Sequence, residues 1–189
     1  MAWRGGPHDG PALGGPLAKP PSAVPRSGGK KLPPKLERRR LVLRFRAVLP
    51  STREAINIAV VKVMKVAREA GCIASEIADV EIAVREALAN AIIHGNEGRP
   101  DKKVLLRCYG DPEDGILLAI RDEGKGFDPS TVPDPRSAER LTLPHGRGIF
   151  LMHELMDHAE HRKGGREVVL YKVCRGRKAA KAPPDGGRR

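Results

Sequence analysis

Hydrophobic and polar positions divide the middle of this chain into short apolar stretches. Residues 41–49 (LVLRFRAVL) are largely aliphatic with partial alternation, which predicts a strand. A helix is predicted from Ser51, where Glu54 three residues later completes a capping box, to its end at Gly71. A second helix is predicted over 75–94, because its apolar side chains recur at helical spacing and a glycine follows it.

The second half of the chain holds shorter predicted elements separated by turns. In chain order they are strands over 103–109 and 116–121 around a DPEDG turn, a Gly- and Pro-rich loop, a short helix over 148–157, and a hairpin of strands over 158–163 and 166–174. Strands and helices are therefore grouped rather than strictly alternating. This order predicts an α+β fold with a mixed, mostly antiparallel sheet and helices on one face.

Charge separates the two ends of the chain from its middle. The 189 residues hold 35 Lys and Arg against 23 Asp and Glu, but residues 1–40 carry a net +7 and residues 175–189 a net +5, so 41–174 is neutral. The first segment is also rich in Pro and Gly, too poor in apolar surface to offset its ordering entropy. We expect one domain over 41–174 between two disordered basic tails, 1–40 and 175–189. Nucleic acid is then expected to bind only weakly, through the tails.

Several classes of protein are disfavoured by composition. The cysteines, Cys72, Cys108 and Cys174, are too scattered for a disulfide framework or a zinc cluster and are interpreted as small buried side chains in a reducing compartment. No apolar run resembles a signal peptide or a membrane span, so a cytoplasmic protein without membrane contact is expected. Aromatic residues make up only 3%, which disfavours stacking platforms for bases.

The second predicted helix carries polar side chains within an apolar surround. Glu86, Asn90 and His94 follow one another by one helical turn and share a face, opposite an apolar stripe. An ordinary exposed polar edge has the same pattern. The functional interpretation is a carboxylate that orients a nucleophile beside an amide oxygen that ligates a hard cation such as Mg²⁺.

Two glycine motifs follow. Asp122 ends a predicted strand, and Gly124 and Gly126 after it allow close backbone approach, so the carboxylate can accept a hydrogen bond from a ligand amino group. Gly146 and Gly148 precede or open the short helix, where exposed backbone N–H groups and the helix dipole favour an anion. Each motif alone also fits an ordinary turn. The second motif lacks the GK[ST] ending of a Walker A loop and the third glycine of a Rossmann fingerprint.

The order of these motifs is more specific than any one of them. REALANAIIHGN, RDEGKGFD and HGRGIFLMHELMD together resemble the ATP-binding domain of the GHKL superfamily, and within it the anti-sigma-factor serine/threonine protein kinases of bacteria. The resemblance spans about 41–174. It implies the two-layer α/β sandwich of the Bergerat type, with ATP and Mg²⁺ as cofactors.

The resemblance also implies roles for individual residues. Glu86 matches the general base, Asn90 the Mg²⁺ ligand, and Asp122 the aspartate that binds the adenine amino group. The remaining matches are glycines or basic residues near the nucleotide: Gly124 and Gly126 beneath the base and sugar, Gly146 and Gly148 at the phosphates, and Arg147 or Arg140 at the γ-phosphate. The segment 128–144 matches the lid over ATP.

Two places depart from the family pattern. Pro144 and His145 stand just before the third motif, where some members have an arginine that touches the γ-phosphate. The other departure is near the last strand. Gly165 is followed by Arg166, where the family often has a threonine that helps to bind adenine through water.

The resemblance implies a kinase that phosphorylates a small anti-anti-sigma (STAS-type) protein and sequesters a sigma factor, as a cytoplasmic homodimer. Two alternatives stay open: a non-catalytic, ATP-gated binder of the same partners, and a polyanion binder acting through the basic tails.

Overall fold

The structure is a computed structural model that describes residues 41–128 and 147–176. The predicted tail over 1–40, most of the predicted lid, Gly146, Arg140 and residues 177–189 lie outside the described residues. The elements are, in order, β1 (Val42–Pro50), α1 (Arg53–Glu69), α2 (Ala74–Ala89), the π-helix η1 (Asn90–Gly95), β2 (Lys103–Asp111), β3 (Gly115–Arg121), α3 (Gly148–Leu155), β4 (His158–Arg162) and β5 (Glu167–Lys172).

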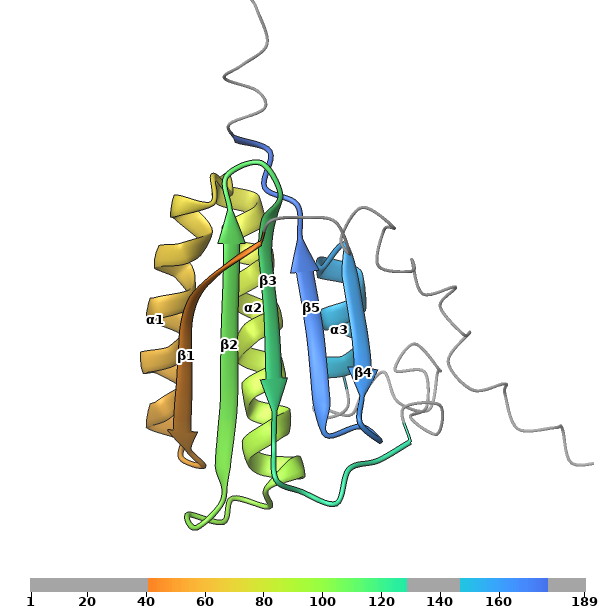
Figure 1. The fold of residues 1–189 in the computed structure, drawn as a ribbon. Coiled ribbons are helices and arrows are strands. Elements are labelled where there is room, and N and C mark those ends of the chain that lie inside the picture. The colour runs from red at the N-terminus through yellow and green to blue at the C-terminus, as the bar shows by residue number, and fades with distance from the viewer. Residues whose placement is uncertain (1–40, 129–146, 177–189) are drawn as a thin grey trace, which may run out of the picture.

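The five strands form one sheet in the order β1-β2-β3-β5-β4. Each neighbouring pair among them is antiparallel, which confirms the mostly antiparallel sheet. The helices α1, α2 and α3 all lie against one face of the sheet, as Figure 1 shows. The predicted α+β sandwich of two layers is thereby confirmed.

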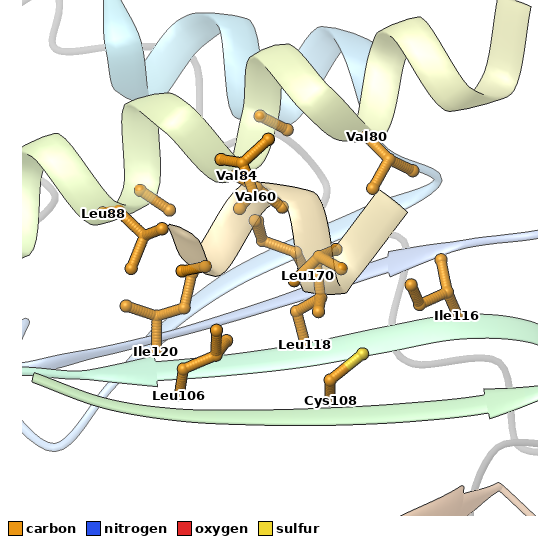
Figure 2. Packing of buried hydrophobic residues seen from close by; sticks show 14 of the residues in the cluster. Val60, Val80, Val84, Leu88, Leu106, Cys108, Ile116, Leu118, Ile120 and Leu170 are labelled. Carbon is orange, nitrogen blue, oxygen red and sulfur yellow. The ribbon is translucent and has the colours of Figure 1, made fainter. Parts of the chain in front are cut away.

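The core lies between α1 and α2 on one side and the inner face of the sheet on the other (Figure 2). The predicted apolar stripe of α2 is confirmed, because Val80, Val84 and Leu88 are fully buried. They face side chains that point inward from the central strands, among them Leu106, Leu118, Ile120 and Leu170. Because this apolar stripe packs against the sheet, the opposite face of α2 is the one left to carry polar side chains.

The start of α1 differs from the prediction. Thr52 is its N-cap and makes no capping hydrogen bond, so the predicted Ser51–Glu54 capping box is wrong. Ser51 is buried, and its hydroxyl donates to the carbonyl of Lys102 (3.0 Å) and accepts from the Asn96 amide (2.8 Å). The Ser51 hydroxyl thus bonds to residues distant in sequence instead of capping the first turn of α1.

Asn96 joins three segments at the end of the sheet where α2 and η1 finish. Its amide nitrogen also donates to the carbonyl of Lys103 (3.0 Å), and its oxygen accepts from the N–H of Glu123 (2.8 Å). The side chain is fully buried. Asn96 therefore fixes the chain after η1 relative to the start of β2 and to the loop after β3, and η1 and this loop line the cavity described below.

The helical run does not stay α-helical to its end. From Asn90 to Gly95 it widens into a π-helix, and the N–H of Asn96 donates five residues back to the carbonyl of Ala91 (2.8 Å). Such turns occur mostly as short interruptions and often at functional sites.

The cysteines are paired differently from the prediction of three thiols. Cys72 and Cys174 form a disulfide between the α1–α2 connection and the segment after β5, and Cys108 is a buried free thiol. The two partners are 102 residues apart in sequence, so no local spacing indicated the pair.

Candidate functional site

A cavity of about 710 Å³ opens where α2, η1, the loop after β3, the start of α3 and the β4–β5 hairpin meet. Most of the residues selected from the sequence lie in its wall. In chain order they are Glu86, Asn90, His94, Asp122, Gly126, Arg147 and Gly148. The three motifs, which are separated by up to 62 residues between Glu86 and Gly148, are thus brought to one place.

Glu86 and Asn90 lie one helical turn apart, half-buried, with Gly148 beside them. A Cβ on Gly148 would stand 2.6 Å from Oε2 of Glu86 and 3.4 Å from Nδ2 of Asn90. Any larger residue at the start of α3 would have to displace the carboxylate. Neither polar side chain forms a hydrogen bond within the part of the chain that the structure describes, so both are available to a ligand.

Asp122 is held at the end of β3. Its N–H donates to the carbonyl of Arg166 (3.0 Å), and its Oδ1 accepts from the N–H of Gly124 (2.8 Å). The side chain is buried, and this burial raises the pKa of the carboxyl group, partly offset by the hydrogen bond from Gly124. A fixed, desolvated acceptor of this kind suits an amino group of a ligand.

Glycine is required where the loop after β3 meets the end of η1. A Cβ on Gly95 would lie 2.5 Å from Cγ of Asp122, and one on Gly124 would lie 2.0 Å from the carbonyl oxygen of Gly95. Gly124 itself is not part of the cavity wall. Its observed role is to let the loop approach η1 and to hold Asp122, while Gly126 lines the cavity.

Basic groups occur on the same wall. Arg147 is the N-cap residue of α3, and Lys125 lies in the loop after β3. The N-terminus of α3 adds backbone N–H groups and the positive end of the helix dipole. This part of the cavity fits an anion such as a phosphate.

The sequence interpretation missed an aromatic part of the wall. His161 on β4 makes an edge contact with Phe127 (ring centroids 5.4 Å apart), and both line the cavity. Burial, followed by the nearby His153, lowers the pKa of His161 to about 4, so the imidazole is neutral at pH 7. These residues form an apolar, uncharged wall. His161 lies in β4 and Phe127 in the loop after β3, and the sequence motifs assigned neither of them a role.

Arg166 stands at the position of the family threonine. Its side chain is exposed, its Nε donates to the carbonyl of Lys163 (3.1 Å), and it is not part of the wall. The water-mediated contact implied by the family pattern therefore has no equivalent at this residue.

The donors present suit Mg²⁺. The Glu86 carboxylate and the Asn90 amide offer oxygen ligands without competing hydrogen bonds, and hard divalent cations prefer oxygen. A cavity with these oxygens near basic groups, and with a fixed carboxylate on another wall, can hold a polyphosphate and a nitrogen base together.

Comparisons with known proteins identify relatives. The family described as histidine kinase-like ATPase domain matches residues 49–172. The anti-sigma F factor of Clostridium beijerinckii is 37% identical over 102 residues, 51% of this chain and 71% of that protein. The anti-sigma F factor of Halalkalibacterium halodurans is also 37% identical, over 90 residues, but the match spans only 59% of that protein and 45% of this chain.

Two further similarities cover more of this chain. The serine-protein kinase RsbW of Listeria innocua is 29% identical over 132 residues, 66% of this chain and 83% of that protein. A solved structure of the RsbU and RsbW domains of Rv1364c from Mycobacterium tuberculosis aligns with a TM-score of 0.45 at 21% identity, over 68% of this chain and 32% of that chain. Within 41–128 and 147–176, every helix is too short or too polar to cross a lipid bilayer.

Proposed function

Because the chain belongs to the histidine kinase-like ATPase family, we propose that it binds ATP with Mg²⁺ in this cavity and phosphorylates a serine or threonine of a protein partner. The resemblance inferred from the three motifs is confirmed by the family match and by relatives named anti-sigma F factor and serine-protein kinase RsbW. Those names support the finer proposal of an anti-sigma kinase.

The observation that carries the proposal is the close approach of Glu86 on α2 to Gly148, the first residue of α3. Oε2 of Glu86 stands where the first residue of α3 allows no side chain, and Asn90 adjoins the same point. A polyphosphate at the N-terminus of α3 would therefore lie directly beside a carboxylate and an amide.

In the proposed reaction, the hydroxyl oxygen of the partner forms a bond to the γ-phosphorus of ATP, and the bond from that phosphorus to the β–γ bridging oxygen breaks. Glu86 accepts the hydroxyl proton, and ADP carries away the electron pair of the broken bond. Mg²⁺ would supply charge neutralisation at the phosphates, with Asn90 as its protein ligand. Such transfer depends mainly on positioning and charge stabilisation.

The remaining wall residues are proposed to bind the nucleotide. Asp122 accepts a hydrogen bond from the adenine amino group, Gly126 and Phe127 lie beneath or beside the base and sugar, and Arg147 contacts the phosphates. Gly146 and Arg140 remain predictions for the phosphate end, and Gly124 is assigned the indirect role of holding Asp122.

The proposed partners follow from the relatives. We propose that the phosphorylated protein is an anti-anti-sigma antagonist, and that the unphosphorylated antagonist releases a sigma factor which this chain otherwise sequesters. Both partners would be met in the bacterial cytoplasm. A homodimer is part of the same proposal.

Calorimetric titration with Mg-ATP tests the nucleotide site. Wild type should bind saturably and only with Mg²⁺, and Asn90→Ala should lose most of this binding. Asn57→Ala is the matched control, because Asn57 is an exposed asparagine on α1 and does not line the cavity. Equal binding by the wild type and Asn90→Ala would contradict the assignment of Asn90.

A second candidate is an ATP-gated binder without catalysis, favoured by the exposed Arg166 in place of the threonine. Glu86→Gln separates the two functions. If the chain is a kinase, this variant loses transfer of the γ-phosphate to a cognate antagonist but keeps ATP binding. If it is only a binder, wild type itself shows no transfer while ATP still changes partner affinity.

A further inference from the structure

The chain after β5 runs beside the α1–α2 connection, at the opposite end of α2 from the cavity. The N–H of Gly176 donates to the carbonyl of Gly71 (2.9 Å). Cys72 and Cys174, one residue after and two residues before these partners, are both buried and joined as a disulfide.

Glu76 holds both cysteine-bearing segments. Its Oε2 accepts from the N–H of Ile73 (2.9 Å) and from the N–H of Arg175 (3.2 Å), the residues that follow Cys72 and Cys174. These bonds do not depend on the disulfide. The two cysteines should therefore remain adjacent after reduction.

The second carboxylate oxygen of Glu76 is unexplained by the fold. The residue is only 5% exposed, yet among the described residues Oε1 has no hydrogen-bond partner, and its nearest cation, the Arg175 Nε, lies 4.0 Å away. Arg175 offers this oxygen a distant charge but no hydrogen bond, and a buried carboxylate oxygen without a hydrogen bond is costly, so a ligand there would stabilise it.

The donor atoms around this oxygen fit a metal ion. One carboxylate oxygen of Glu76 and the two Sγ atoms of Cys72 and Cys174 lie within 4.8 Å of one another, and all three residues are buried. We propose that the reduced cysteine pair, with Glu76, binds a thiophilic divalent cation such as Zn²⁺, and that the disulfide is the metal-free, oxidised form of the same site.

The donor set predicts selectivity. Two sulfurs and one carboxylate are ligands that Zn²⁺ prefers, whereas Mg²⁺ demands oxygens. Three protein ligands leave one position of a tetrahedral ion for water. Binding displaces the two thiol protons. Oxidation passes two electrons to a small-molecule disulfide, which becomes two thiols, and the metal ion is released as the Cys72–Cys174 bond forms.

The test uses the full chain in two redox states. Protein reduced with a phosphine is incubated with Zn²⁺, desalted and analysed for metal, and affinity is measured by competition with a chromophoric chelator. We expect one ion per reduced chain, none per oxidised chain, and no displacement by excess Mg²⁺. Retention of zinc by the oxidised form, or none by the reduced form, would overturn the proposal.

Variants identify the ligands. Cys72→Ser and Cys174→Ser should weaken binding by more than about a hundredfold and Glu76→Gln by more than about tenfold. Cys108→Ala, the matched control, removes a buried thiol outside the site and should bind as wild type does. Unchanged affinity in Glu76→Gln would overturn the assignment of the third ligand.

A spectroscopic readout on the wild type avoids dependence on the folding of variants. Co²⁺ should give a sulfur-to-metal charge-transfer band with the reduced chain only, and absence of that band would contradict thiolate ligation. Asn90→Ala should bind zinc normally, so failure of this proposal and failure of the proposed nucleotide site are distinguishable.

Discussion

Gly148, the first residue of α3, lies against the carboxylate of Glu86 on α2. A Cβ on this glycine would lie 2.6 Å from Oε2 of Glu86. The helix α3, whose N-terminus is proposed to bind phosphate, therefore begins directly beside the proposed general base. The two proposed functions of the site, holding the nucleotide and receiving the proton, are coupled through this contact.

Gly148→Ala tests that coupling. The added methyl group should push the Glu86 carboxylate aside, because a side-chain end yields more easily than a helix, and phosphoryl transfer should fall about a hundredfold. Helix propensity favours alanine, so the stability of the fold should not fall greatly. Transfer to a cognate antagonist and thermal unfolding are measured together.

The matched control is Gly98→Ala. A Cβ there meets nothing within 4 Å, although Gly98 has a positive φ of 65°, so the variant should lose about 1 kcal/mol of stability and keep its transfer rate. Unchanged transfer in Gly148→Ala would show that the position of Glu86 does not matter.

Asp122→Asn separates binding from stability. Burial raises the pKa of Asp122, so its ionised form destabilises the fold at neutral pH. The variant should be at least as stable as wild type at pH 7, and the difference should vanish as the pH falls below the ordinary pKa of an aspartate. Chemical denaturation over a pH series measures this difference.

The same variant should bind ATP at least about tenfold more weakly. The amide nitrogen that replaces Oδ2 is a donor and cannot accept a hydrogen bond from the adenine amino group. Inosine triphosphate, which lacks that amino group, should lose much less affinity. An equal loss for both nucleotides would assign Asp122 to another part of the ligand.

The lowered pKa of His161 predicts that the fold loses stability in acid. Its pKa in the fold is about 4 against an ordinary value of 6.5, so the unfolded chain binds the proton more tightly. The free energy of unfolding should therefore fall as the pH is lowered from about 6.5 to 4, by roughly 2 to 3 kcal/mol from this residue.

His161→Phe keeps an aromatic ring beside Phe127 and should flatten that pH dependence. His153, whose pKa is lowered first by burial and then by His158, leaves a residual slope of the same sign. A pH profile identical to that of wild type would mean that His161 is solvated in the fold.

Asn96→Ala removes the side chain that joins three segments. Its buried hydrogen bonds to Ser51, Lys103 and Glu123 would all be lost, at a cost of about 2 to 4 kcal/mol of unfolding free energy. Asn57→Ala is the control, because the exposed Asn57 side chain accepts a hydrogen bond from Arg85, and its loss should change stability by less than about 0.5 kcal/mol. Similar losses in both variants would contradict the special position of Asn96.

The disulfide should contribute to stability in the absence of metal. With a chelator present, reduction should lower the free energy of unfolding by about 2 to 4 kcal/mol, because the bond constrains a loop of about 100 residues in the unfolded chain. The reductant should have the same effect on Cys108→Ala and none on the Cys72→Ser/Cys174→Ser double variant. A reductant effect that persists in the double variant would have another origin.

The sequence predicted what local patterns encode. The period of Val80, Val84 and Leu88 identified the buried face of α2, and the opposite face then had to carry Glu86 and Asn90. The DPEDG turn and the Gly164-Gly165 hairpin set the antiparallel neighbours. Together these patterns brought the three motifs to one cavity.

The rest depends on contacts between distant segments. Ser51 appeared to be a cap because its partner Asn96, 45 residues away, leaves no local trace. The Cys72–Cys174 pair lacks any recognisable spacing for the same reason. His161 and Phe127 line the cavity together because the β4–β5 hairpin packs against the loop after β3. There the N–H of Phe127 donates to the carbonyl of Gly164 (3.0 Å).

The π-helix after Asn90 acts as a one-residue insertion in an otherwise α-helical run. In a regular α-helix the N–H of Asn96 would bond to Ile92, but it bonds to Ala91, so the chain reaches Asn96 with one residue more than an α-helix would need. Deleting a single residue between Asn90 and Asn96 would restore α-helical spacing. It would also change the residue presented to Ser51, Lys103 and Glu123. The irregularity in the helix therefore allows Asn90, the proposed Mg²⁺ ligand, and the buried Asn96 to occupy their places at the same time.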